Sequence, residues 1–213
     1  TRLTCDWSSD VCSSDLPLRE IMLSVPVHCM LDDHELEDNW EPTACSPTWE
    51  DDLTQEGIEA FQRHQRTSPV GSQRSPLWGT VRLRSDHEAF VLDTRTGRDP
   101  RPWPATSQPS VHILGEDQRD ALESWLPSVA AGHPRWIVSP VWLLPRPVGT
   151  PDSQGQPQPM IPALCDAWPG YPDSLHWLLG LIAGQRIENV VMLCGDAHLA
   201  GHTVLTLTTG VQK

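Results

Sequence analysis

Short runs of apolar residues recur along the chain, each with the length of a buried strand. They cover residues 25–31, 89–92, 136–139 and 189–194. Apolar runs of this length without strict alternation are typical of strands that are buried on both faces of a sheet. We therefore predict a strand at each run, the first of them interrupted by Pro26.

Between these runs, apolar residues recur at the spacing of an α-helix. The segments are residues 51–65, 115–126 and 172–183. In the second, Leu122 and Trp125 lie on one face and the first turn is acidic, which suits the helix dipole. We expect Pro127 to end this helix. The alternation of strands and helices predicts an α/β fold whose sheet is covered on both faces.

Polar clusters directly follow three of the predicted strands. They are Asp32-Asp-His-Glu35, Asp93-Thr-Arg95 and Gly195-Asp-Ala-His198. In open α/β sheets, ligands bind beyond the carboxyl ends of the strands, so the three clusters could converge on one site. Carboxylates hold hard cations, and imidazole also serves zinc, iron or manganese. The pattern therefore indicates a metal centre.

Each cluster also has a purely structural interpretation. An acidic run such as residues 32–35 is ordinarily solvated surface charge, and it lacks the glycine and the terminal Glu of an EF-hand loop. Asp196 could cap the next element and His198 could be a surface histidine. Arg95 could form a structural salt bridge with Asp93 or Asp99. Sequence spacing leaves these alternatives open.

Composition excludes some classes of function. The formal net charge is −13, and clustered Lys and Arg of the kind that bind nucleic acid are absent. The apolar runs are far shorter than the roughly 20 residues of a transmembrane helix. Prolines gather at about 97–110 and 145–163, which we predict to be long surface loops. Cys29 and Cys194 lie in apolar runs, and we expect buried thiols there.

The first sixteen residues have neither a strand period nor a helix period. The run Asp6–Leu16 back-translates as a common sequencing-library adapter, and Cys5 fits the adapter bases just upstream. A natural disordered tail would have to match this string by chance. We therefore expect residues 1–16 to be a non-native tail. Residues 17–213 are then expected to be the C-terminal portion of a domain that begins upstream, with a net charge of −11 because the tail holds one Arg and three Asp.

Four motifs in order resemble the PhoD-like branch of the calcineurin-type metallophosphatases. They are Leu31-Asp-Asp-His-Glu35 with Asn39-Trp40, Leu92-Asp-Thr-Arg95, Leu114-Gly-Glu-Asp-Gln118 through Leu126, and Gly195-Asp-Ala-His198. A further stretch, Asp166-Ala-Trp-Pro-Gly-Tyr-Pro172, is also similar to an element of this family. The resemblance spans residue 17 to about residue 204. It implies part of a metallophosphatase-type layered β-sheet fold flanked by helices.

The resemblance also implies a function, namely hydrolysis of phosphate mono- or diesters by metal-activated water at a centre of two or more ions. It implies metal ligands at Asp33, Asp196 and His198, with Asn39 as a weaker candidate. His34 would be the acid that protonates the leaving oxygen, and Arg95 would grip phosphate. Calcium with iron is the metal content that the family suggests.

The family's earlier motifs, among them a GD-x-x-Tyr element, precede the DDHE strand, and residues 17–31 do not supply them. We therefore expect the isolated chain to be inactive and prone to aggregate. One alternative is a non-catalytic binding module on the same scaffold, and another is an unrelated acidic α/β domain. Substrate, compartment and oligomeric state are not specified by the sequence.

Overall fold

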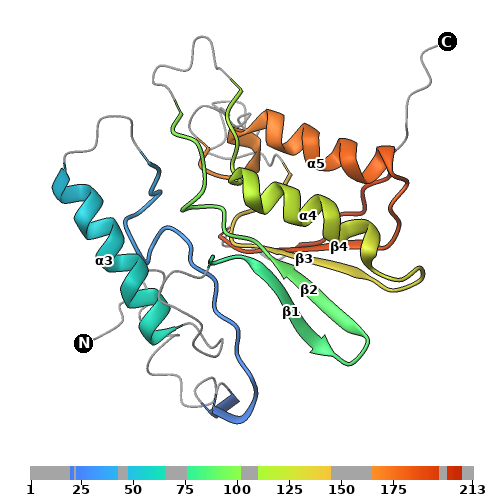
Figure 1. Cartoon of the computed structure of the whole chain (residues 1–213), viewed down its shortest axis with the longest axis horizontal. Helices are drawn as coiled ribbons and strands as arrows, with labels where there is room; N and C mark the ends of the chain where they lie inside the picture. Colours follow the sequence, from blue (N-terminus) through green and yellow to red (C-terminus); the bar gives the residue numbers. More distant parts are fainter. Residues whose placement is uncertain are drawn as a thin grey trace, which may run out of the picture.

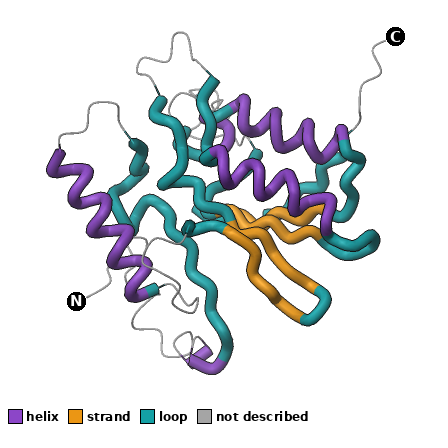
Figure 2. Tube along the Cα trace, in the orientation of Figure 1, coloured by secondary structure: helices purple, strands orange, loops and turns teal. Residues whose placement is uncertain are grey.

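A computed structural model of the chain describes residues 20–21, 23–42, 48–65, 76–101, 110–144, 165–196 and 201–207 (Figures 1 and 2). The side chains of residues 48–53 are not described. The predicted adapter tail, most of the first proline-rich loop, all of the second, and His198 lie outside the described residues.

The described elements alternate between helices and strands, as Figure 1 shows. In chain order they are α3 (Thr48–His64), β1 (Gly79–Arg84), β2 (His87–Val91), α4 (Glu116–Ser128), β3 (Arg135–Ser139), the 3-10 turn η2 (Trp168–Gly170), α5 (Pro172–Gly184) and β4 (Val190–Cys194). The three predicted helices and the last three predicted strands are confirmed. Helix α4 contains Pro127 in its last turn instead of ending before it.

The structure corrects one strand prediction and adds a strand that was not predicted. Residues 25–31 form no strand, and the described sheet takes none of its strands from this segment. Pro26 cannot donate a ladder hydrogen bond, and Val25 at the start of the run is 50% exposed. Conversely, β1 was not predicted, although its alternation of Val81 and Leu83 with polar residues has the period of a strand.

The four strands form one mixed sheet in the order β1-β2-β3-β4. Strand β1 pairs antiparallel with β2, and β2, β3 and β4 are parallel. The chain advances across the sheet in one direction, β2–α4–β3 and then β3–α5–β4. Right-handed crossovers that advance in the same direction place their helices on the same face. Accordingly, α4 and α5 lie on one side of the sheet in Figure 1.

The predicted coverage of both faces is therefore wrong for the described residues. The core lies between the sheet and the two helices, and it joins Phe90 and Ile137 of the strands to Leu122, Leu126 and Leu178 of the helices. Alternate strand residues point to the opposite face. These include Trp136 and Val138 of β3 and Val191 and Leu193 of β4, and Leu193 is 50% exposed.

The two cysteine predictions are also wrong. Cys194 is exposed, and Cys29 is only partly buried. Cys194 ends β4, which is an edge strand of the described sheet, so nothing described covers its outer side. An apolar run that is buried in the middle of a sheet and one that forms its edge have the same sequence pattern. Trp168, in contrast, is fully buried, as expected of a packing residue.

Candidate metal centre

The carboxyl ends of the parallel strands β2 and β4 carry the predicted polar clusters. Asp93 and Arg95 follow β2, and Asp196 follows β4. The DDHE turn, which comes earlier in the chain, lies at the same edge of the sheet. This position follows from the direct hydrogen bond between Asp32 and Arg95. The structure thus brings together three clusters that are far apart in the sequence.

The DDHE segment folds as a turn around Asp33. The backbone carbonyl of Asp33 accepts hydrogen bonds from the N–H groups of Leu36 and Glu37, both at 2.7 Å. Its side-chain Oδ2 accepts one from the backbone N–H of Asn39 at 2.7 Å, and Asn39 takes a left-handed φ of 56°. Asp33 is 2% exposed. These contacts hold one carboxylate oxygen and leave the other for a different partner.

Three carboxylates converge beside this turn. Asp32, Asp33 and Asp196 each bring one oxygen atom to within 4.8 Å of the others. The buried Oδ1 of Asp33 has no hydrogen-bond partner. Buried polar atoms in native proteins are nearly always satisfied, so an orphaned carboxylate oxygen among other carboxylates fits a bound cation. The donor set contains only oxygen, which suits a hard ion.

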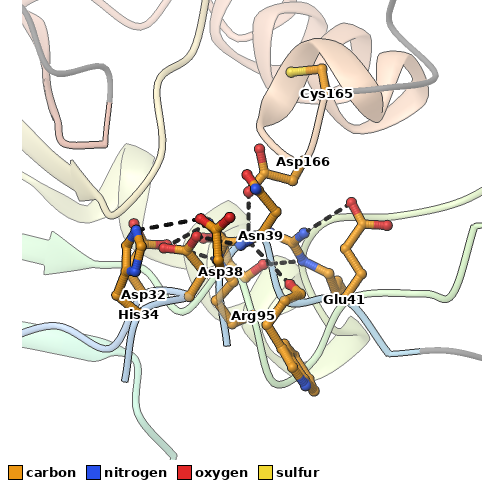
Figure 3. A network of polar contacts seen from close by, with 12 residues as sticks. Asp32, His34, Asp38, Asn39, Glu41, Arg95, Cys165 and Asp166 are labelled. Atoms are coloured by element: carbon orange, nitrogen blue, oxygen red, sulfur yellow. Dashed lines mark hydrogen bonds and ion pairs between the residues drawn. The ribbon is translucent and has the colours of Figure 1, made fainter. Parts of the chain in front are cut away.

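Arg95 has a fully buried side chain and contacts both Asp32 and Asp166. Figure 3 shows these three residues in one network of polar contacts. The Nε of Arg95 donates to Asp32 Oδ1 at 2.7 Å, and its Nη1 donates to Asp166 Oδ2 at 2.7 Å and to the Trp40 carbonyl at 3.1 Å. Its Nη2 lies 3.6 Å from Asp33 Oδ1 without making a hydrogen bond. The salt bridges considered with Asp93 or Asp99 are not formed by this guanidinium, which pairs with Asp32 and Asp166 instead.

Asp93 shapes the loop that carries Arg95. Its Oδ1 accepts the backbone N–H groups of Arg95 and Thr96, each at 2.9 Å, and its Oδ2 accepts the hydroxyl of Thr96. The side chain of Gln118 holds the backbone of Asp93 from α4 through two hydrogen bonds of 2.9 and 2.8 Å. Asp93 and Gln118 therefore determine where Arg95 stands.

The loop that carries Asp166 requires a glycine. The backbone of Gly170 passes so close to the carbonyl oxygen of Cys165 that a Cβ atom there would overlap it. The same carbonyl accepts a hydrogen bond of 2.6 Å from Arg101, whose guanidinium also pairs with Glu41. This packing positions Asp166 toward Arg95.

Carboxylates outnumber cations in the described ion pairs of Arg95. Asp32, Asp33 and Asp166 share its single guanidinium. Burial raises the pKa of Asp32 to about 6, against the opposing effect of Arg95 and with a further increase from Asp33 and Asp196. Burial disfavours the charged form of Arg95, yet Asp32 and Asp166 raise its pKa above the ordinary value. A bound cation would relieve the excess negative charge.

The remaining predicted residues lie around the cluster. His34 is 36% exposed at its side chain, and its Nε2 lies 3.6 Å from Asp38 Oδ1. Asp33, His34 and Asp38 form a second group of converging ligand atoms. Asn39 is exposed, and its described contact is the one that its backbone makes with Asp33. Asp196 has a left-handed φ of 64°.

Sequence reasoning missed three residues of this network, Asp32, Asp166 and Gln118. Asp32 is the neighbour of Asp33, which was the predicted metal ligand. A run of consecutive acidic residues does not reveal the turn geometry that gives the two side chains different contacts. Asp166 and Gln118 stand in motifs that carry the family resemblance, which was the available signal. Their partners, Arg95 and Asp93, are distant in the sequence.

Gly195 offers a test of how the site is assembled. A Cβ at this position would lie 2.7 Å from the carbonyl oxygen of Pro140, so Gly195→Ala must shift the backbone that carries Asp196. We expect a loss of about 1–3 kcal/mol in the free energy of unfolding, together with weaker cation binding. Chemical denaturation and calorimetric Ca²⁺ titration measure the two effects.

Gly180→Ala is the matched control, because a Cβ added at this position inside α5 would meet nothing within 4 Å. This change should raise stability by roughly 0.5–1 kcal/mol and leave cation binding unaltered. Equal effects of the two substitutions would contradict the argument from crowding.

Comparisons with known proteins identify relatives of this chain. The family model of the PhoD-like phosphatases matches residues 10–210. A solved structure of PhoD superposes with a TM-score of 0.61 at 26% sequence identity, covering 78% of this chain and 33% of that one. No curated protein matches the chain significantly. None of the described helices is long and apolar enough to cross a membrane. The expected fold class is confirmed, and the chain belongs to the PhoD-like phosphatase family.

Proposed function

We propose that this chain supplies part of the metal centre of a phosphoester hydrolase that acts on phosphate mono- or diesters. The observation that carries the proposal is the convergence of Asp32, Asp33 and Asp196 around the orphaned Oδ1 of Asp33. Carboxylate oxygens gathered at the edge of the sheet where β2 and β4 end suit a cation-assisted reaction on an anionic substrate.

Within this proposal, Asp33 is the central metal ligand, and Asp32 and Asp196 are its neighbours in the ligand set. Asn39 and His198, which the family resemblance suggests, would complete it. When bound, metal ions supply an activated water and offset charge on the phosphoryl oxygens. Calcium fits the carboxylate oxygens, and iron would draw on an imidazole as well.

We assign His34 as the acid for the leaving oxygen. Its side chain is partly exposed, so it can reach a substrate, and Asp38 faces its Nε2 at 3.6 Å. Imidazole is the side chain that most often serves as a general acid.

We assign Arg95 as a positioning residue. Three of its N–H groups already donate to Asp32, Asp166 and the carbonyl of Trp40, and its side chain is fully buried. Nε and Nη1 of this guanidinium hold the carboxylates of Asp32 and Asp166 in place, while the buried Nη2 makes no described hydrogen bond.

The chain spans about a third of the length of the solved PhoD structure. The proposed activity should therefore be tested on the protein that the whole gene encodes. The source locus should be sequenced upstream of this chain, and the encoded protein assayed with an aryl phosphate monoester and a diester. We expect an upstream GD-x-x-Tyr motif and hydrolysis that EDTA abolishes and Ca²⁺ with iron restores. A continuous frame without these ligands, or hydrolysis indifferent to EDTA, would overturn the proposal.

A further inference from the structure

A third group of metal-ligand side chains lies at the opposite end of the sheet from the carboxylate cluster. It combines Asp86 and His87, at the turn between β1 and β2, with His133, in the loop between α4 and β3. The hairpin turn and this loop lie where β2 and β3 begin, whereas Asp93 and Asp196 follow the strand ends (Figure 1). The two groups therefore share no residue.

The three side chains already converge. Each brings one ligand atom to within 4.8 Å of the other two. The imidazole rings of His87 and His133 are 5.4 Å apart between centroids, at an interplanar angle of 53°. Two ligands of a tetrahedral zinc ion lie about 3.4 Å apart. Asp86 stands in a turn and His133 in a loop. Rotation of their side chains can shorten the distances between the ligand atoms to this value.

The contacts of the two rings suit metal binding. Nδ1 of His133 lies 3.1 Å from the backbone carbonyl of Asp86. A carbonyl can only accept, so this nitrogen donates and Nε2 is the atom of His133 that can bind a metal, as in many metal-binding histidines. Nδ1 of His87 is buried without a hydrogen-bond partner and lies 2.9 Å from Oδ1 of Asp86, so these two atoms can face one ion together.

The surroundings do not oppose a divalent cation. The group lines an open pocket of about 340 Å³ that also holds Arg82, Arg84 and Glu88. The two arginines are balanced by the carboxylates of Asp86 and Glu88.

We propose that Asp86, His87 and His133 bind a divalent transition metal of the zinc type, at a site separate from the phosphatase centre. Two imidazole nitrogens and one carboxylate oxygen suit zinc, cobalt or nickel and disfavour calcium, which takes oxygen ligands. The ion would join the β1–β2 hairpin to the loop that precedes β3. Three protein ligands leave a fourth position for water.

The test is a calorimetric titration of the metal-free purified protein with Zn²⁺, followed by Co²⁺ with detection of its visible absorption. We expect one Zn²⁺ ion to bind at this site, with an affinity that falls at least about tenfold in His87→Ala and in His133→Ala. His176→Ala, at an exposed position on α5, is the matched control and should bind as the unchanged protein does. Asp33→Asn should still bind this Zn²⁺ ion. That outcome would show that the ion does not bind at the proposed phosphatase centre.

A measurement without substitutions covers the case in which a variant fails to fold. Diethyl pyrocarbonate modifies accessible histidines, and mass spectrometry locates the modified residues. Zn²⁺ should slow the modification of His87 and His133 and leave that of His176 unchanged. Zinc binding that ignores both substitutions, or modification of His133 at the same rate with and without Zn²⁺, would overturn the proposal.

Discussion

Asp33→Asn should abolish cation binding at the carboxylate cluster and reduce phosphoester hydrolysis by the whole protein at least about 100-fold. The amide oxygen of Asn can still accept the N–H of Asn39, so the turn should persist. What disappears is the negative charge at the orphaned Oδ1, which lies among Asp32 and Asp196. The substitution therefore separates the chemistry of the site from its folding.

Terbium is the probe for the isolated chain, because it binds where calcium does and emits when nearby tryptophans are excited. Asp33→Asn should lose this sensitised emission, while the free energy of unfolding of the metal-free protein changes little. Asp120→Asn, at an exposed position on α4, is the matched control and should keep the emission. Undiminished emission and hydrolysis in Asp33→Asn would show that the cluster is only surface charge.

Arg95→Leu is expected to cost about 3–5 kcal/mol in the free energy of unfolding. The guanidinium is fully buried and pairs with Asp32 and Asp166, so its removal leaves two carboxylates without their cation. The loss should be larger above pH 6 than below it. The pKa of Asp32 is already raised to about 6, so this group is protonated in more acidic solution, where a missing cation costs less.

Urea denaturation on both sides of pH 6 measures this effect. Arg63→Leu, at an exposed position on α3, serves as the control and should change stability by no more than about 0.5 kcal/mol. The loss of stability in Arg95→Lys should lie between those of Arg95→Leu and Arg63→Leu. An ammonium keeps the charge but cannot reproduce the planar guanidinium that binds both Asp32 and Asp166. A loss in Arg95→Leu no greater than that in Arg63→Leu would refute the positioning role.

Periodicity predicts well those elements that bury one face through their own pattern of apolar residues. In α4 the buried Leu122, Trp125 and Leu126 follow the helical stripe visible in the sequence, and β3 matches its apolar run. The segment 25–31 has a similar run and forms no strand, because a strand exists only where a partner offers hydrogen bonds. Pairing is a long-range property that an apolar run does not encode.

The candidate site divides in the same way. Residue patterns along the chain are enough to predict the α/β class, the three polar clusters and, through the motifs, the family. Tertiary contacts are needed to show that Arg95 is enclosed by Asp32 and Asp166, that Gln118 holds Asp93, and that α4 and α5 share one face. Propensity and periodicity depend on neighbours a few residues away. Charge pairing and burial depend on segments that only folding brings together, and their partners here are separated by up to 71 positions.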